Sequence, residues 1–387
     1  MRRWLLPEHI EDILPAEALT IEHLRRAILD RFQAHGYELV APPLLEYLES
    51  LLSGTGNDLD LATFKLVDRL SGRLMGVRAD HTPQVARIDA HLLDRAGVTR
   101  LCYCGSVLHT VPSGMTKTRE PIQIGAELYG HAGIEADLEV LGLLAGTLTG
   151  SGVAGLTIDL GHPGIYRALV EGAPHDAEES EALFHAVQQK DAPGVMSAAA
   201  ALPPERREAL AKLTRFNGGA ELIARARREL PPLPGVLAAL DALQRLARDA
   251  AAPGLALSVD LAELGGFNYE SGIVFAAFAP GSPDALARGG RYDDVGRSFG
   301  RARPATGFTM DLRQLAALVP GTPRRMGILA PASGDAELAA LVAGLRDAGE
   351  IVIADLPGHE AARAELGCDR TIENAGGRWQ VISLKGN

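Results

Sequence analysis

The sequence contains only three cysteines, Cys102, Cys104 and Cys368, among its 387 residues. They cannot form a disulfide framework, and the C-x-C pair lacks the second pair that a structural zinc site needs. The eleven histidines are scattered, with no pair at metal-ligand spacing. We therefore expect no metal and no cofactor. Sparse cysteine suits a reducing compartment, so we expect a cytoplasmic protein.

Positive charge is also scarce, because 38 lysines and arginines face 49 aspartates and glutamates and leave a net charge of -11. Proteins that bind nucleic acids usually neutralise phosphates with clustered basic side chains. The composition therefore disfavours extensive nucleic-acid binding, although a local basic patch would still be compatible with it.

No apolar run predicts a membrane segment. The best candidate, residues 140–158, is uncharged but contains five glycines, and Gly150-Ser151-Gly152 would break a spanning helix near its middle. The amino-terminal segment Met1–Pro7 contains no apolar run long enough for a signal peptide. We expect a helix over 134–149, a turn, a strand over 156–159, and no membrane partner.

The remaining patterns predict an α+β protein. Apolar residues at helical spacing predict a helix over 15–35, and the middle of the chain, rich in Ala, Leu, Arg and Glu, predicts several helices. Gly289-Gly290-Arg291-Tyr292 is typical of a turn. The other elements expected in the first 320 residues are strands at 37–40, 99–108, 122–129, 256–261, 272–278 and 305–310, a hairpin at 63–68 and 74–78, and helices at 83–95 and 311–318.

The last 60 or so residues alternate between strand and helix patterns, which indicates a small α/β unit. Strands are expected at 326–329, 351–354 and 378–384, and helices at 335–348 and 360–366. The predicted organisation is thus a domain over 1–320 with a helical insertion at about 165–252, followed by a small α/β domain over 325–387.

Generic motif searches find no active site. The run Gly150–Gly155 matches G-x-G-x-x-G, but it follows a predicted helix and precedes a strand, the reverse of a dinucleotide site, so we interpret it as a turn. The sequence has no Walker A, G-x-S-x-G, H-E-x-x-H or C-x-x-C motif.

Four segments taken together resemble histidyl-tRNA synthetase, a class II aminoacyl-tRNA synthetase. Their order and spacing fit its catalytic domain, with the helical insertion between the second and the third. This resemblance implies an antiparallel sheet flanked by helices that dimerises through its amino-terminal elements. The segments are 77–82 (VRADHT), 105–109 with 123–130 (GSVLH and QIGAELYG), 264–269 leading to 274–275 (LGGFNY and VF), and 289–293 with 304–308 (GGRYD and PATGF).

The positions that handle ATP do not match this family. Where the synthetases place arginines, this chain has His109, Gly265 and Gln314. Loss of one preorganised charge donor costs about 3–4 kcal/mol of transition-state stabilisation, or roughly 10²–10³ in rate. We therefore expect no synthetase catalysis, no catalytic residue, and an ATP region without cationic charge.

The amino-acid pocket of the family is better preserved. The resemblance places Asp80, Thr82, Gln123 and Glu127 around the ligand ammonium, which needs acceptors to offset its desolvation. The Tyr-Tyr pair of histidyl enzymes is Tyr269-Glu270 here, and a carboxylate can accept an imidazole N–H. These six residues form the candidate histidine site. The alternative is a relic pocket that holds only water.

The carboxy-terminal unit is short and carries many acids, so we expect no tRNA as a partner. A synthetase-like chain with these losses resembles the regulatory subunits of ATP phosphoribosyltransferase over essentially its whole length. That family implies a non-catalytic chain that activates a short catalytic subunit in the first step of L-histidine biosynthesis and permits feedback by histidine. It also implies self-association as a dimer within a hetero-octamer.

Two other functions remain open from the sequence. One is a degenerate histidyl-tRNA synthetase, which amino-acid-dependent exchange of pyrophosphate with ATP would reveal. The other is a stand-alone amino-acid sensor for a different partner.

Overall fold

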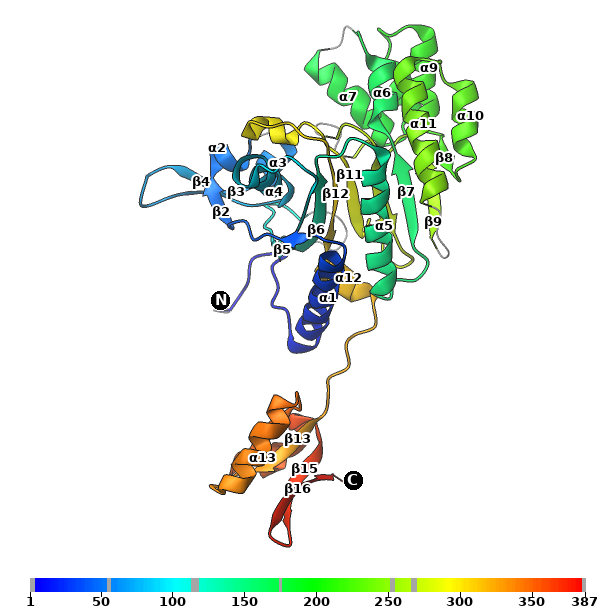
Figure 1. Ribbon diagram of the computed structural model, residues 1–387. Helices are drawn as coiled ribbons and strands as arrows, with labels where there is room; N and C mark the ends of the chain where they lie inside the picture. The colour runs from blue at the N-terminus through cyan, green and yellow to red at the C-terminus, as the bar shows by residue number, and fades with distance from the viewer. Residues whose placement is uncertain are drawn as a thin grey trace. The chain divides into compact units, whose positions relative to one another are not determined.

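The computed structural model describes residues 4–53, 57–112, 118–173, 176–250, 255–265 and 270–384 (Figure 1). The chain divides into two compact units, Met1–Gly321 and Thr322–Asn387. No helix within the described ranges is long and apolar enough to cross a membrane.

The first unit is built on a mixed sheet of nine described strands. The six central strands pair with one another in antiparallel fashion, whereas β1 joins β5 and β9 joins β7 in parallel. The α+β class is confirmed, with these parallel edge pairs added to the antiparallel sheet. In spatial order the strands are β1 (Glu38–Leu39), β5 (Thr99–Ser106), β6 (Ile122–Tyr129), β12 (Ala305–Asp311), β11 (Ala287–Arg291), β10 (Val274–Phe278), β7 (Thr157–Gly161), β9 (Ala256–Asp260) and β8 (Asn217–Gly218).

One face of this sheet is covered by α1 (Pro15–Ala34), α5 (Ile134–Gly150) and α12 (Leu312–Leu318). The predicted amino-terminal helix is confirmed as α1, whose Ile28 and Phe32 are almost fully buried. It ends before Gly36, which has a positive φ that glycine adopts without a steric cost. This face contains the main hydrophobic core.

The opposite face is covered by α4 (Thr82–Arg87), a π-helical continuation over Ile88–Leu93, and the 3-10 helix η2 (Val295–Phe299). The helix predicted at 83–95 is therefore present, with its second half wound more widely than expected. Buried Asp89 of the π-helical part pairs with buried Arg303 at 2.9 Å, which ties this helix to the segment that enters β12.

Between β7 and β9 the described residues form six helices: α6 (Pro163–Val170), α7 (Ala177–Gln188), α8 (Ala192–Ala198), α9 (Pro204–Leu213), α10 (Leu222–Glu229) and α11 (Pro234–Asp249). Four of them have a proline in the first turn, where the missing N–H would have had no intrahelical partner. Figure 1 shows these helices grouped at the β7–β9 end of the sheet.

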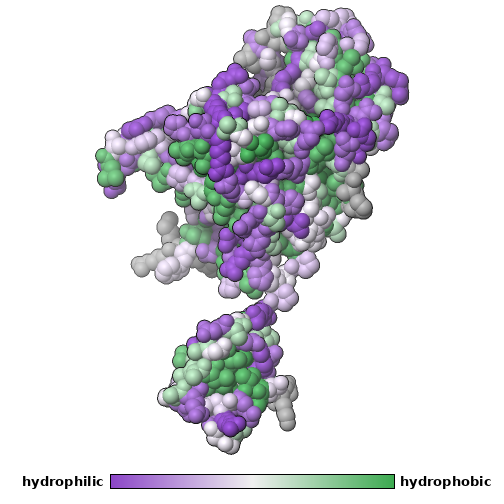
Figure 2. Space-filling view, viewed as in Figure 1, coloured by the Kyte–Doolittle hydropathy of each residue, from purple (hydrophilic) through white to green (hydrophobic). Residues whose placement is uncertain are grey.

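A separate three-stranded sheet contains the predicted hairpin, now β3 (Phe64–Val67) and β4 (Leu74–Val77), together with β2 (Leu45–Tyr47). The short helices α2 (Leu48–Leu51) and α3 (Asn57–Ala62) both lie in the connection between β2 and β3. At the hairpin tip Leu70 is 98% exposed, and Figure 2 shows a small hydrophobic area at this projecting end.

The turn predicted at Gly289–Tyr292 is wrong, because these glycines lie inside β11. A Cβ at Gly289 would lie 2.3 Å from the carbonyl oxygen of Gly307 and 2.6 Å from the ring of Phe275. The glycine pair therefore allows close approach of neighbouring groups within the sheet and does not reverse the chain.

The second unit has a four-stranded sheet in the order β14 (Val352–Asp355), β13 (Gly327–Pro331), β15 (Cys368–Ala375) and β16 (Arg378–Ser383). It also contains α13 (Ala336–Asp347) and the 3-10 helix η3 (Glu360–Leu366), and its own small core includes Ile328 and Ile372. Strand β15 was not predicted, because its mostly polar, half-exposed sequence carries little strand signal.

Candidate functional site

The alternation of side chains along three central strands places the candidate residues on one face of the sheet. In β6, Ile124 and Ala126 point into the main core, so Gln123 and Glu127 point to the opposite face. The strand register then aligns Glu127 with Gly307 and Gly290 in one row across the sheet. A second row contains Gly125, Thr309 and Arg288. Glycines in these rows leave space above the sheet.

Glu127 lies at the bottom of this space and is almost completely buried. Its Oε1 accepts hydrogen bonds from the hydroxyls of Tyr103 at 3.1 Å and Thr82 at 3.3 Å, and its Oε2 accepts one from Tyr292. Burial raises the pKa of Glu127 to about 8, against the lowering effect of these hydrogen bonds. A Cβ at Gly307 would lie 1.5 Å from Oε2, so only glycine fits beside this carboxyl.

Asp80 is held above Glu127 by neighbouring polar groups. Gln123 donates from its amide nitrogen to Asp80 Oδ1 at 2.8 Å, and the backbone N–H of Thr82 donates to the same oxygen at 3.2 Å. The carboxamide oxygen of Gln123 in turn accepts the backbone N–H of His81 at 2.9 Å. Gln123 therefore orients Asp80, and the other Asp80 oxygen receives none of these bonds.

The structure brings Asp80, Thr82, Glu127 and Glu270 together around one small cavity of about 70 Å³. Glu270 is buried, and its Oε2 has no hydrogen-bond partner among the described residues. Burial, followed by the nearby Glu263, raises the pKa of Glu270 well above its usual range. Two buried carboxyls that favour the neutral form thus line this cavity, and Arg288 is the one cation among its described lining residues. The remaining predicted residue, Tyr269, lies outside the described residues.

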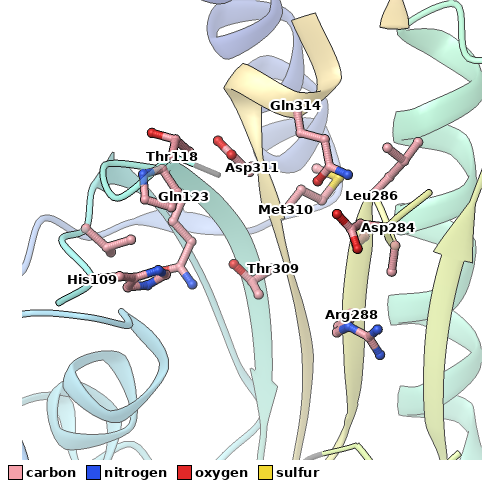
Figure 3. A pocket seen from close by; sticks show the side chains of 14 residues that line it. His109, Thr118, Gln123, Asp284, Leu286, Arg288, Thr309, Met310, Asp311 and Gln314 are labelled. Carbon is pink, nitrogen blue, oxygen red and sulfur yellow. The ribbon is translucent and has the colours of Figure 1, made fainter. Parts of the chain in front are cut away.

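A larger cavity of about 390 Å³ lies beside the small one and shares Arg288 and Thr309 with it. It is lined by Gln123 and by two positions where the synthetase arginines are missing, His109 and Gln314 (Figure 3). His109 Nε2 lies 3.0 Å from the carbonyl oxygen of Ala79, and Gln314 donates to the hydroxyl of Ser282 at 3.0 Å. Both side chains are thus engaged by the protein itself.

The expectation that this region has no cationic charge is wrong, because Arg288 of β11 lines both cavities. Figure 3 shows it on the side of the larger cavity opposite His109 and Gln123. Gly265, the third altered position, lines neither cavity, but a Cβ placed on it would lie 3.7 Å from Arg288 Nη1. The guanidinium of Arg288 therefore lies close to the position where the synthetases have an arginine.

Sequence reasoning missed Arg288, Tyr103 and Tyr292 as members of the site. Tyr292 lies within the 289–293 segment, and Arg288 directly precedes it, so their position in the chain was a usable signal. The direction of their side chains could not be predicted, because the segment was interpreted as a turn. Among the described residues, no group of three or more His, Cys, Asp or Glu side chains is placed to hold a metal ion.

Comparison with protein families gives a match for each unit. Residues 9–315 match the family described as histidyl-tRNA synthetase. Residues 324–382 match the family described as ATP phosphoribosyltransferase subunit HisZ C-terminal domain.

Curated relatives and solved structures are similar over almost the full chain. The ATP phosphoribosyltransferase regulatory subunit of Ralstonia nicotianae is 57% identical over 385 residues, which cover 100% of this chain and 99% of that protein. That of Azoarcus sp. is 56% identical over 384 residues, covering 99% and 100%.

A crystal structure of an ATP phosphoribosyltransferase regulatory subunit/histidyl-tRNA synthetase from Bacillus halodurans superposes with a TM-score of 0.82 at 25% identity, covering 94% of this chain and 96% of that one. Histidyl-tRNA synthetase from Nostoc sp. has a TM-score of 0.76 at 16% identity, covering 99% and 97%, and supports the fold alone. The chain therefore belongs to the family of ATP phosphoribosyltransferase regulatory subunits.

Proposed function

We propose that this chain is a non-catalytic regulatory subunit of ATP phosphoribosyltransferase. It assembles with a short catalytic subunit, as a dimer within a hetero-octamer, and activates it. Binding of L-histidine to the small cavity allows feedback on the first step of histidine biosynthesis.

The observation that carries this proposal is the set of acceptors around the small cavity. Asp80 is oriented by Gln123 and Thr82, and the buried carboxyls of Glu127 and Glu270 line the same cavity. A ligand ammonium can donate to these acceptors, and each charge-assisted hydrogen bond is about twice as strong as a neutral one. An imidazole N–H provides a donor for the unpartnered oxygen of Glu270.

The larger cavity supports regulation in place of amino-acid activation. His109 and Gln314 are both held by neighbouring protein groups, and Asp284 and Asp311 add acidic side chains to the lining. Carboxylates near the position of a triphosphate repel it. A synthetase needs several fixed positive charges there, and Arg288 is the one cation among the described residues that line this cavity, so it is poorly suited to the activation step.

Regulation requires that histidine bind two states of the complex with different affinity. A coupling free energy of about 1–3 kcal/mol between the histidine site and the catalytic subunit is typical of such systems. The small cavity is a suitable sensor because a charged ligand changes the ionisation of buried acids that lie directly on the central sheet.

The test is phosphoribosyl transfer by the short catalytic subunit of the same organism, with and without this chain, over a histidine titration. We expect stimulation by the chain and inhibition of the complex by histidine. Absence of both stimulation and co-elution would refute the proposal and favour a sensor for another partner. Amino-acid-dependent exchange of pyrophosphate with ATP by the chain alone would refute it in favour of a degenerate synthetase.

A further inference from the structure

The two cavities contain several acids but share a single arginine among the described lining residues, Arg288. An amino acid carries a carboxylate as well as an ammonium. The acids of the small cavity can accept hydrogen bonds from the ammonium, but they do not bind the carboxylate. A ligand that fills the site therefore needs a cation at the boundary between the two cavities, where Arg288 lies.

We infer that Arg288 is the residue that binds the α-carboxylate of the amino-acid ligand and so determines the specificity of the site for free amino acids. This inference rests on the proposed histidine site. Arg288, on strand β11, takes the place of the arginine that the synthetases have at the position of Gly265. The ligand ammonium lies toward Asp80, and its carboxylate points toward the larger cavity.

The present contacts of Arg288 leave its guanidinium available. Its side chain is 58% exposed, and its one ion pair among the described residues is to Glu263 at 3.6 Å, beyond hydrogen-bond distance. The Oε1 atom of Glu263 already accepts the backbone N–H of Gly265 at 2.9 Å. A ligand carboxylate can therefore form a bidentate pair with Arg288 without first breaking a strong interaction.

Two other arginines near the site, Arg291 and Arg78, are held by protein groups, in contrast to Arg288. Arg291, three residues further along β11, is buried and paired with Asp137 at 2.8 Å. Arg78 donates to the carbonyl oxygens of Pro42 at 2.7 Å and Ser106 at 2.9 Å. These arginines stabilise the fold, whereas Arg288 faces the cavities.

Local geometry fixes the position of Arg288. Its register partner in β12 is Thr309, which also lines both cavities, and the alternation in β11 sends Ala287 to the core and Arg288 to the site face. The small cavity, about 70 Å³, is much smaller than the adjoining cavity of about 390 Å³. The carboxylate end of an amino acid bound at Asp80 can therefore extend past Arg288 into the larger cavity.

The test compares L-histidine with histamine, which lacks the carboxylate, by titration calorimetry on the full chain. We expect the wild-type chain to bind histidine roughly 10- to 100-fold more tightly than histamine, the range for a hydrogen-bonded charge pair. Arg288→Gln should reduce this ratio to about one while leaving histamine affinity unchanged, and Arg288→Lys should restore part of it. Arg297→Gln, which removes an exposed arginine of η2, is the matched control and should keep the wild-type ratio.

The outcomes separate this inference from the proposed function. If the wild-type chain binds neither ligand, the proposed histidine site fails and the inference fails with it. If the wild-type chain binds histidine but does not discriminate against histamine, or if Arg288→Gln keeps the discrimination, the role of Arg288 is refuted and the histidine site stands.

Discussion

At the scale of single residues, the site combines two kinds of acid: one that hydrogen bonds hold in a fixed orientation and one that is buried. Asp80 is partly accessible and held in place by Gln123, whereas Glu127 is enclosed by the hydroxyls of Tyr103, Tyr292 and Thr82. Asp80 is therefore suited to bind a ligand directly. Glu127 is suited to change its ionisation in response to the charge of the ligand.

Asp80→Asn should weaken histidine binding by roughly 10- to 100-fold, because hydrogen bonds to charged groups contribute about 1.5–3 kcal/mol. The substitution keeps the shape and removes only the charge. Asp94→Asn is the control, since Asp94 is an exposed acid that pairs with Arg301 at the end of the π-helical segment. Calorimetry measures both, and equal affinity for Asp80→Asn and wild type would place the ammonium elsewhere.

The raised pKa of Glu127 predicts how stability depends on pH. Its pKa is about 8 in the folded chain against an ordinary 4.5, so between these values the folded state holds a proton that the unfolded state has released. The free energy of unfolding therefore falls as pH rises through this window, and the contribution is lost above about pH 8.

Glu127→Gln should remove this contribution. Its stability relative to wild type should increase between about pH 5 and about pH 8, as measured by urea unfolding at several pH values. Glu178→Gln, on the exposed surface of α7, should show no such change relative to wild type. A constant difference between Glu127→Gln and wild type across the window would contradict a neutral Glu127 in the folded chain.

At the scale of elements, the apolar periodicity was sufficient for most of the fold. The spacing of Ile21, Leu24, Ile28 and Phe32 predicted α1, and the expected strand at 122–129 coincides with β6. In both elements the apolar residues that face the main core recur at the period of the element, which is the property that a sequence pattern records.

Sequence reasoning missed β11 because its glycines, which usually indicate a turn, are present for a different reason. Gly289 and Gly290 resemble turn residues, yet both lie within β11. A Cβ at Gly289 would overlap Phe275 and Gly307, and a Cβ at Gly290 would overlap the carbonyl oxygen of Ile273. This error also concealed Arg288, whose direction depends on the alternation along that strand. The grouping of Asp80, Thr82 and Glu127 came from the family resemblance, since no local pattern joins residues so far apart in the chain.

Gly307→Ala should destabilise the chain by about 1–3 kcal/mol, because the new methyl group would overlap the Glu127 carboxyl and the neighbouring strand. It should also abolish histidine binding. Gly142→Ala is the matched control at an exposed position of α5, where a Cβ meets nothing within 4 Å, and should stabilise by about 0.5–1 kcal/mol. Unfolding by urea measures both, and a neutral Gly307→Ala would contradict the packing beside Glu127.

At the scale of the whole molecule, the two units have separate roles in this account. Every described residue of both cavities belongs to the first unit, and the second unit has its own small core. We propose that residues 1–321 form an independent binding domain. The chain truncated after Gly321 should therefore bind histidine with the affinity of the full chain. Loss of binding by a fragment with native circular dichroism would show that the second unit completes the site.

The most direct measurement of the central claim is histidine inhibition of phosphoribosyl transfer by the assembled complex, compared between the wild-type chain and Asp80→Asn. We expect both chains to stimulate the catalytic subunit equally, because Asp80 lies inside the cavity and its substitution leaves the surface unchanged. The histidine concentration for half-inhibition should be roughly 10- to 100-fold higher with Asp80→Asn, in proportion to the lost binding. Identical inhibition curves, with weakened binding to the isolated Asp80→Asn chain, would show that histidine regulates the complex from another site.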